Sequence, residues 1–255
     1  MMQLIALRRL LPRSWRTRLR TPWNQLLDLE QSGAERRFYR PFLRAGDLVF
    51  DIGAHHGEKC AAFLSLGARV VAVEPNPNGL ALLSKRFPRE IETGRLIVLP
   101  VAVGRSAGRV QLRQFLLDGC NASVSDVFAR ALEEELGAPS AVFDVEMIAG
   151  ASLFERYGMP AFIKIDVEGM DAEVLSTVPC RPRMLSFEFN QAPHCVPLTN
   201  ACFVEVARLG FTEANFTEGA DPRLLLREWV KPDRLLEEIS RAAQGRAIWG
   251  DVVVR

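Results

Sequence analysis

Short apolar runs alternate with amphipathic stretches along the first half of the chain. The apolar runs are Leu48–Asp51, Arg69–Glu74 and Leu96–Val103, and helical patterns cover 57–66 and 78–87. Runs that are apolar throughout are typical of strands buried on both faces, and helices as connections are typical of parallel sheets. The pattern therefore predicts an α/β fold, with a parallel sheet that carries helices on both faces.

The same alternation returns after residue 160 and continues to the end of the chain. It predicts strands at Ala161–Asp166, Met184–Phe189, Phe211–Phe216 and Ile248–Val254, with helices over 170–178, 199–209 and 233–243. A length of 255 residues suits one large domain. We expect that domain to cover residues 41–255.

Residues 105–150 follow a different pattern. Val110 and Leu112 alternate with polar neighbours, and so do the apolar positions within 143–147. Alternation with a period of two predicts strands with one buried face, so we expect an antiparallel β-hairpin excursion here. Between its strands, the stretch 126–136 has the composition of a helix.

Composition and charge exclude several classes of protein. Hydrophobic residues make up 48% of the chain, which excludes wholesale disorder, and a net charge of +1 argues against a nucleic-acid-binding protein. Five cysteines form no CxxC pair, so we expect neither a disulfide framework nor a structural zinc site. No apolar stretch approaches the ~20 residues of a membrane span. We therefore expect a cytoplasmic protein.

The N-terminus is the one unusual segment. Residues 1–20 contain six arginines and no acid, interleaved with leucines and Trp15. Charge runs are usually solvated, so we expect residues 1–40 to form an Arg-rich helical extension. A basic amphipathic segment of this kind is also able to dock weakly on an anionic membrane or a partner.

Four acids fall at the carboxyl ends of predicted strands: Asp51, Glu74, Asp166 and Glu188. In an open parallel sheet, ligands bind at this end of the strands. The sequence therefore places its candidate chemistry at one edge of the sheet.

The turn after the first strand indicates a nucleoside cofactor. Gly53 and Gly57 let the backbone approach a ligand, and Glu74 ends the next strand, where an acid can accept hydrogen bonds from a ribose. NAD would need Gly-x-Gly-x-x-Gly, and Asp51 would repel its pyrophosphate. The same acid attracts the sulfonium and amino groups of S-adenosylmethionine, so electrostatics favours the methyl donor. An NAD-dependent oxidoreductase and a non-catalytic scaffold with this fold are the alternatives.

Four sequence blocks resemble the FkbM-type methyltransferases. They are VFDIGAHHG at 49–57, VAVEPNP at 71–77, VAVG at 101–104 and IKIDVEG at 163–169. The likeness covers about residues 47–190. It implies a class I, Rossmann-like methyltransferase fold with a seven-stranded, mostly parallel sheet whose last strand is antiparallel. Many members of this family resemble O-methyltransferases of natural products or sugars.

The chain departs from this family at one place. A Thr-Leu-Asp element usually precedes the helix before the IKID strand, and here the stretch 147–151 reads MIAGA. An Asp with a structural or substrate role is therefore missing.

The resemblance also implies roles for the cofactor residues. Asp51 and Gly53 would hold the methionine part of the donor, with Gly57 in the same turn, and Glu74 would hold the ribose. Ala102 and Val103, at the end of the third strand, would border the adenine.

Catalytic candidates lie at the ends of the later strands. Asp166 is placed to contact the cofactor's amino group, a substrate hydroxyl or a metal, and Lys164 shares its sheet face and is expected to pair with a carboxylate. Glu168 is either a helix N-terminal charge or a ligand-binding group. Glu188 and His194 are the candidate general bases. Asp166, Glu188 and His194 are metal-ligand types, but no ligand spacing indicates a metal site, and we predict none.

These observations together predict a methyltransferase that uses S-adenosylmethionine. The expected reaction is O-methylation of a small-molecule or sugar hydroxyl. We expect a small-molecule or glycan acceptor and no nucleic acid.

Overall fold

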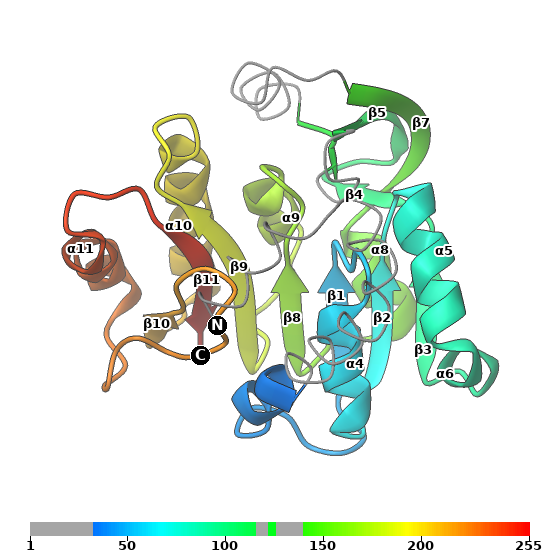
Figure 1. The fold of residues 1–255 in the computed structure, drawn as a ribbon, viewed down its shortest axis with the longest axis horizontal. Helices are drawn as coiled ribbons and strands as arrows, with labels where there is room; N and C mark the ends of the chain where they lie inside the picture. Colours follow the sequence, from blue (N-terminus) through cyan, green and yellow to red (C-terminus); the bar gives the residue numbers. More distant parts are fainter. Residues whose placement is uncertain (1–32, 116–121, 126–139) are drawn as a thin grey trace, which may run out of the picture.

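The computed structural model describes residues 33–115, 122–125 and 140–255 (Figure 1). The predicted helix over 126–136 and the Arg-rich segment 1–20 lie outside these residues, as does most of the expected extension. In the part of the chain that is described, no helix is long and apolar enough to cross a membrane.

Seven strands form the main sheet, in the order β10-β11-β9-β8-β1-β2-β3. Their bounds are Leu48–Ile52 for β1, Arg69–Val73 for β2, Leu96–Leu99 for β3, Phe162–Ile165 for β8, Met184–Asn190 for β9, Ala214–Phe216 for β10 and Trp249–Val254 for β11. Pairings from β3 to β9 are all parallel, whereas β11 is antiparallel to both β9 and β10. The predicted class I methyltransferase topology, with an antiparallel last strand, is confirmed.

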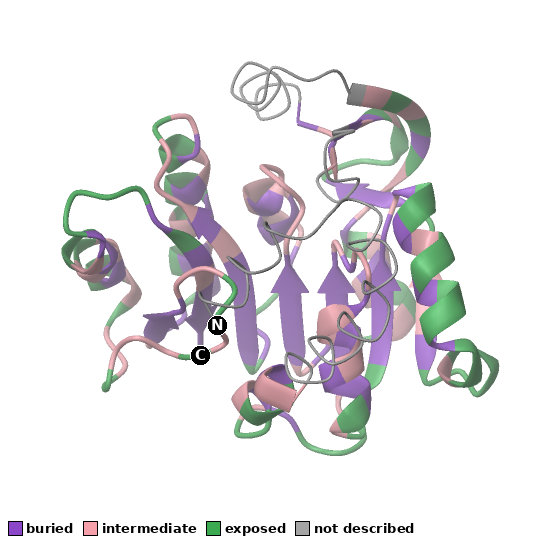
Figure 2. Ribbon diagram, in the orientation of Figure 1, coloured by how far each residue is buried: buried purple, intermediate pink, exposed green. Residues whose placement is uncertain are grey.

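Helices cover both faces of this sheet, as the sequence predicts (Figure 1). Their bounds are Glu58–Ser65 for α4, Pro77–Arg86 for α5, Pro88–Glu92 for α6, Ala151–Tyr157 for α8, Asp171–Ser176 for α9, Val196–Leu209 for α10 and Pro232–Ala243 for α11. One apolar core packs α8, α9, α10 and α11 on one face, and a second packs α4 and α5 on the other. The strands between them are almost wholly buried (Figure 2).

The stretch that precedes β1 packs on the same face as α4. Residues 33–39 are helical, and Tyr39 is 1% exposed. Its ring makes edge contacts with Phe63 of α4 and Phe162 of β8, at centroid distances of 4.7 and 5.5 Å. This aromatic packing ties the described end of residues 1–40 to the core, and the boundary at residue 40 stays a prediction.

The prediction of a single strand over 96–103 is wrong. The strand β3 ends at Leu99, and a separate strand, β4 (Ala102–Gly104), belongs to another sheet. Pro100 lies between them, and proline has no N–H to donate to a strand ladder. The chain therefore leaves the main sheet at this residue.

The second sheet contains the predicted hairpin. Its order is β4-β7-β5-β6, and β5 (Gly108–Phe115) runs antiparallel to β7 (Ser140–Ala149). The short strand β6 (Ala122–Ser123) lies at its edge. The Nδ2 of Asn78 in α5 donates to Oε1 of the buried Gln114 at 3.1 Å, which ties the hairpin to the main body. The small sheet thus lies beside the carboxyl ends of the main strands (Figure 1).

Candidate active site

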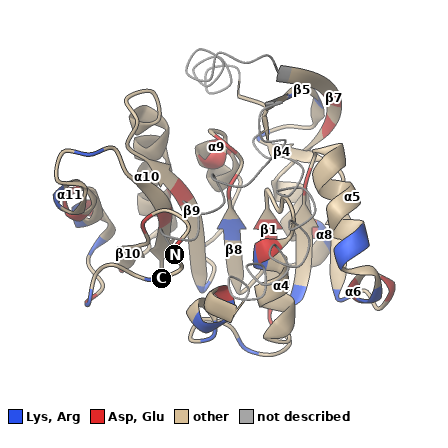
Figure 3. Cartoon of the chain, viewed as in Figure 1, with Lys and Arg blue, Asp and Glu red and all other residues tan. Residues whose placement is uncertain are grey.

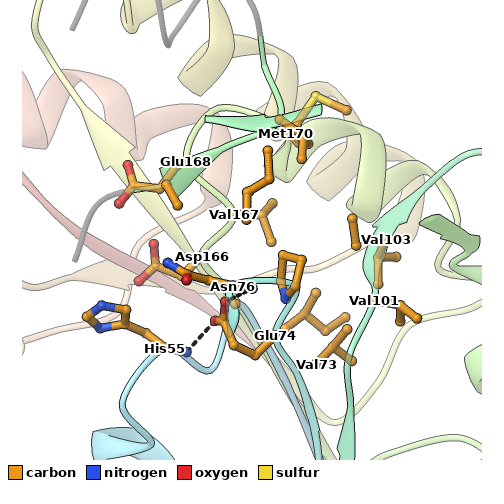
Figure 4. A pocket seen from close by; sticks show the side chains of 17 residues that line it. His55, Val73, Glu74, Asn76, Val101, Val103, Asp166, Val167, Glu168 and Met170 are labelled. Carbon is orange, nitrogen blue, oxygen red and sulfur yellow. Dashed lines mark hydrogen bonds between the residues drawn. The ribbon is translucent and has the colours of Figure 1, made fainter. Parts of the chain in front are cut away.

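A cavity of about 140 Å³ opens at the carboxyl ends of β1, β2 and β8, and the small sheet forms part of its wall. Its volume is several times what a water molecule needs. Figure 4 shows the carboxylates of Asp166 and Glu168 on one side and the apolar Val101 and Val103 on the other. The remaining lining residues are Ile52, Gly53, His55, Val73, Glu74, Pro75, Asn76, Ala102, Leu112, Ala122, Val124, Val167 and Met170.

Glu74 is held by two backbone donors at the floor of this cavity. The N–H of His55 donates to Oε2 and the N–H of Asn76 donates to Oε1, both at 2.7 Å (Figure 4). Burial raises the pKa of Glu74, and these two hydrogen bonds oppose the rise. Each oxygen keeps a lone pair for a further donor. The carboxylate is therefore fixed in place and suited to the two hydroxyls of a ribose.

Gly53 and Gly57 have different roles in the turn. A Cβ on Gly53, whose φ is +86°, would stand 1.8 Å from the carbonyl oxygen of Asp166, so only glycine lets β1 and β8 end this close together. A Cβ on Gly57 would meet Leu83 and Phe87 at 2.6 Å instead. Gly53 lines the cavity, whereas Gly57 is a packing residue at the start of α4, and its predicted cofactor role stays a prediction.

Asp51 does not line the cavity. Its side chain is 1% exposed and accepts a hydrogen bond from Sγ of Cys60 in α4 at 3.0 Å. Burial raises its pKa to about 6, against the Cys60 hydrogen bond and the charges of Lys164 and Lys59. A direct contact of Asp51 with the methionine part of a donor therefore stays a prediction.

The two residues predicted to border the adenine line the cavity, and their contact with an adenine stays a prediction. Ala102 and Val103 line the cavity from β4, and Leu112 and Val124 of the hairpin region join them. The alternating pattern of β5 and β7 predicted a hairpin but not its position over the cavity. The hairpin lies over the cavity because β7 pairs with β4, which precedes it by more than thirty residues in the sequence.

A lysine-linked chain of acids lies at the same edge. Nζ of the buried Lys164 is 3.1 Å from Asp166 and 3.0 Å from Asp251 of β11. Burial disfavours its charge, but these two carboxylates outweigh that effect and hold the pKa of Lys164 well above its usual value. Lys59 of α4 forms an ion pair with the buried Glu35, and the charges of Glu35 and Asp251 raise the pKa of Lys59 against the effect of burial. The predicted pairing of Lys164 with a carboxylate is confirmed (Figure 3 shows the basic segment of β8 among acidic segments of β1, β9 and α9).

Three carboxylates meet beside the cavity. One oxygen from each of Asp166, Glu168 and Glu188 lies within 4.8 Å of the others. We call these three residues the carboxylate group. Burial and the charges of Asp166, Glu168 and Asp171 raise the pKa of Glu188 well above its usual value, while Lys164 opposes them.

The backbone of Glu168 is fixed by the small sheet. Its φ of +51° is left-handed, which is uncommon for a residue with a Cβ. Oγ of Ser123 in β6 donates to its carbonyl oxygen at 2.6 Å, and the N–H of Ser125 donates to the same hydroxyl. Glu168 lines the cavity, and the choice between its two predicted roles stays a prediction.

The histidines divide between the cavity and its surroundings. His194 lies in the turn between β9 and α10 and is not among the residues that line the cavity, so its role as a base stays a prediction. His55 does line the cavity, and its ring stacks on His56 with centroids 3.5 Å apart. A left-handed φ of +49° at His55 turns the chain so that its N–H reaches Glu74.

The solved structures that match this chain are distant from it in sequence. A precorrin-6y C5,15-methyltransferase from Geobacter metallireducens GS-15 is 10% identical, with 88% of each chain covered and a TM-score of 0.44. A putative rRNA-methylase from Clostridium thermocellum is 8% identical, with 87% of this chain and 94% of that chain covered and a TM-score of 0.45. A phosphoethanolamine N-methyltransferase 2 from Haemonchus contortus, in complex with S-adenosyl-L-methionine, is 10% identical, with 86% and 51% covered and a TM-score of 0.43. At this level of likeness we conclude nothing about this chain from them.

The family is shown by the sequence itself. No curated protein matches the chain. The family model described as the methyltransferase FkbM domain matches residues 51–212, which is more than half of the chain and includes the end of β1, all of β2 and β8, and the residues that line the cavity. The chain belongs to the FkbM methyltransferase domain family, whose members use S-adenosylmethionine as methyl donor.

Proposed function

We propose that this methyltransferase methylates a hydroxyl group of a small molecule or glycan. The observation that carries the proposal is the carboxylate group, which stands at the edge of the donor cavity. A carboxylate can accept the proton that a hydroxyl loses when its oxygen is methylated. The proposal includes a cytoplasmic location, for which cysteine usage is the support, and no nucleic-acid partner.

The cavity residues support S-adenosylmethionine over NAD. Glu74 suits the ribose hydroxyls, and the apolar wall around Ala102 and Val103 suits an adenine. Bound there, the donor supplies a methyl group on a positively charged sulfur. The carboxylates of Asp166 and Glu168 favour a cation at that position and oppose the pyrophosphate of NAD.

The chain's own residues would do two things during transfer. Fixed walls orient the acceptor so that its oxygen meets the methyl carbon in line with the carbon–sulfur bond, which accounts for much of the rate of such reactions. As the new carbon–oxygen bond forms and the carbon–sulfur bond breaks, a carboxylate of Asp166 or Glu188 takes the hydroxyl proton. Burial and neighbouring carboxylates raise the pKa of Glu188, which suits its ionised form to accept such a proton.

The first test is calorimetric titration of the purified chain with S-adenosylmethionine, S-adenosylhomocysteine and NAD. We expect the two adenosyl sulfur ligands to bind with micromolar affinity and NAD to give no heat. Binding of NAD alone would favour the oxidoreductase, and no binding of any ligand would favour the scaffold.

The Glu74→Ala variant tests the site within the same experiment. Loss of the charge-assisted hydrogen bonds to the ribose should weaken S-adenosylmethionine binding by about 1–3 kcal/mol. Glu92→Ala, at the exposed end of α6, is the matched control and should bind as the original chain does. Equal affinities in the two folded variants would remove Glu74 from the donor site.

A further inference from the structure

We propose that Asp166, Glu168 and Glu188 form a binding site for a hard divalent cation, of the class of Mg²⁺, Mn²⁺ and Ca²⁺, beside the donor cavity. Their carboxylate oxygens lie within 4.8 Å of one another. A cation with oxygen ligands at about 2.4 Å spans this separation. The three residues come from the end of β8, the following turn and β9, so no spacing in the sequence indicates the site.

The charge balance of the carboxylate group favours a cation. Three carboxylates converge, and the strongest opposing charge on Glu188 among the described residues is Lys164. That lysine is also bonded to Asp251, so its single charge is shared. Like charges this close disfavour one another's ionised forms unless a cation neutralises them.

A second, independent observation comes from Asp171, in the first turn of α9. Its side chain is 6% exposed; Oδ2 accepts from the N–H of Gly169 at 3.3 Å, whereas Oδ1 has no hydrogen-bond donor among the residues that the structure describes. Asp171 and Glu188 line the same small cavity of about 20 Å³, which has room for one water molecule or one ion. An acceptor oxygen that is buried without a donor is rare in proteins. A cation at the carboxylate group, or a water bound to it, would satisfy this oxygen.

The ligand atoms decide the class of metal. All of them are carboxylate oxygens, which hard cations prefer, whereas softer metals prefer thiolate or imidazole. His194, which the sequence grouped with Asp166 and Glu188, is not part of the cluster, and Glu168 takes its place. The chemistry therefore points away from zinc and copper.

The cation's role, but not its binding, rests on the proposed function. Held at this edge of the donor cavity, it would fix an acceptor hydroxyl in place and stabilise the negative charge that grows on its oxygen. The proton leaves that oxygen for a carboxylate or for solvent. Acceptors with two adjacent oxygens would gain most, because both can contact one cation.

The experiment measures binding without donor or acceptor. The full chain is freed of metal with EDTA, dialysed and titrated with MnCl₂, while free Mn²⁺ is followed by electron paramagnetic resonance. We expect one saturable site per chain, with Mg²⁺ or Ca²⁺ in competition. Glu188→Gln and Glu168→Gln should each raise the Kd at least tenfold, because each removes one anionic ligand.

A matched control is available in the neighbouring helix. Glu173→Gln changes a half-buried acid of α9 outside the carboxylate group and should leave the Mn²⁺ Kd unchanged. Circular dichroism confirms that each variant is folded. No saturable binding to the original chain, or the same Kd in all variants, would overturn the cation site. Binding of S-adenosylmethionine is titrated separately, so a chain that binds the donor but not Mn²⁺ loses this site and keeps the proposed function.

Discussion

Two groups of acids share one edge of the sheet and meet at Asp166, yet their charges are balanced in different ways. On the β11 side, Asp251 and Asp166 are bridged by the buried Lys164. On the cavity side, Glu188 has no ion pair among the described residues, although it lies close to Asp166 and Glu168. Lysine-linked acids are neutralised from within the fold. Glu188 lies among like charges instead, and such a cluster of acids with a raised pKa is more typical of a binding site than of a structural ion pair.

The largest expected effect comes from breaking the lysine-linked side. Lys164→Met leaves Asp166 and Asp251 without their shared cation, and loss of one partner from a buried ion pair costs about 3–5 kcal/mol. We expect the free energy of unfolding, measured with urea, to fall by that amount. Lys85→Met, at an exposed position of α5, should change it by less than about 0.5 kcal/mol. A similar small change for both variants would mean that the buried bridge contributes nothing to stability.

A somewhat smaller effect is expected for Asp51, a buried acid bonded to a thiol instead of a lysine. Its pKa is raised to about 6 in the folded chain from the usual 3.8 of an aspartate, so folding favours the protonated form. Stability from this group is present below about pH 4 and is lost as the pH rises through 6. Relative to Asp51→Asn, the free energy of unfolding of the original chain should therefore fall by up to about 3 kcal/mol over this range. Urea unfolding of both chains at several pH values measures it, and a constant difference would contradict the assigned pKa.

The smallest effect is expected for a neutral contact that supports the carboxylate group. Ser123→Ala removes the hydroxyl that donates to the carbonyl oxygen of Glu168 and accepts from Ser125. A net loss of about 1–2 kcal/mol of folding stability should follow, since the buried backbone groups lose their partner. Ser84→Ala, at an exposed position of α5, is the control for thermal unfolding. Equal stabilities of the two variants would show that the hydroxyl is not needed to hold the Glu168 turn.

Sequence patterns predicted much of this arrangement because parallel strands bring their carboxyl ends together. Glu74, Gly53 and Asp166 were placed at one edge in this way, and they line one cavity. The pairing of Lys164 also followed from strand geometry, because residues two apart share a face. These inferences needed only local periodicity and the general topology of such sheets.

The rest depends on contacts between distant segments. Asp51 was expected in the donor site, but its side chain bonds to α4, and a strand pattern does not reveal which face the cavity occupies. Glu168 lies close to Glu188 because its own backbone is left-handed in the turn after β8. A glutamate in the sequence does not predict a left-handed residue. Pro100 did carry a local signal for the break between β3 and β4, since it interrupts the apolar run.

The hydrogen bond from Ser123 of β6 to Glu168 connects the two halves of the site, which are the wall of the cavity and the carboxylate group. Ala122 and Val124 line the cavity, and Ser123 between them bonds to the backbone of Glu168, which lies in the proposed cation site. A ligand that steadies either half therefore steadies the other, and thermodynamic reciprocity requires the two affinities to change by the same factor. Donor titrations with and without Mn²⁺ would give that factor, and identical donor affinities would show that the halves act independently. A donor affinity that rises when Mn²⁺ is present would instead mean that filling one site helps to complete the other.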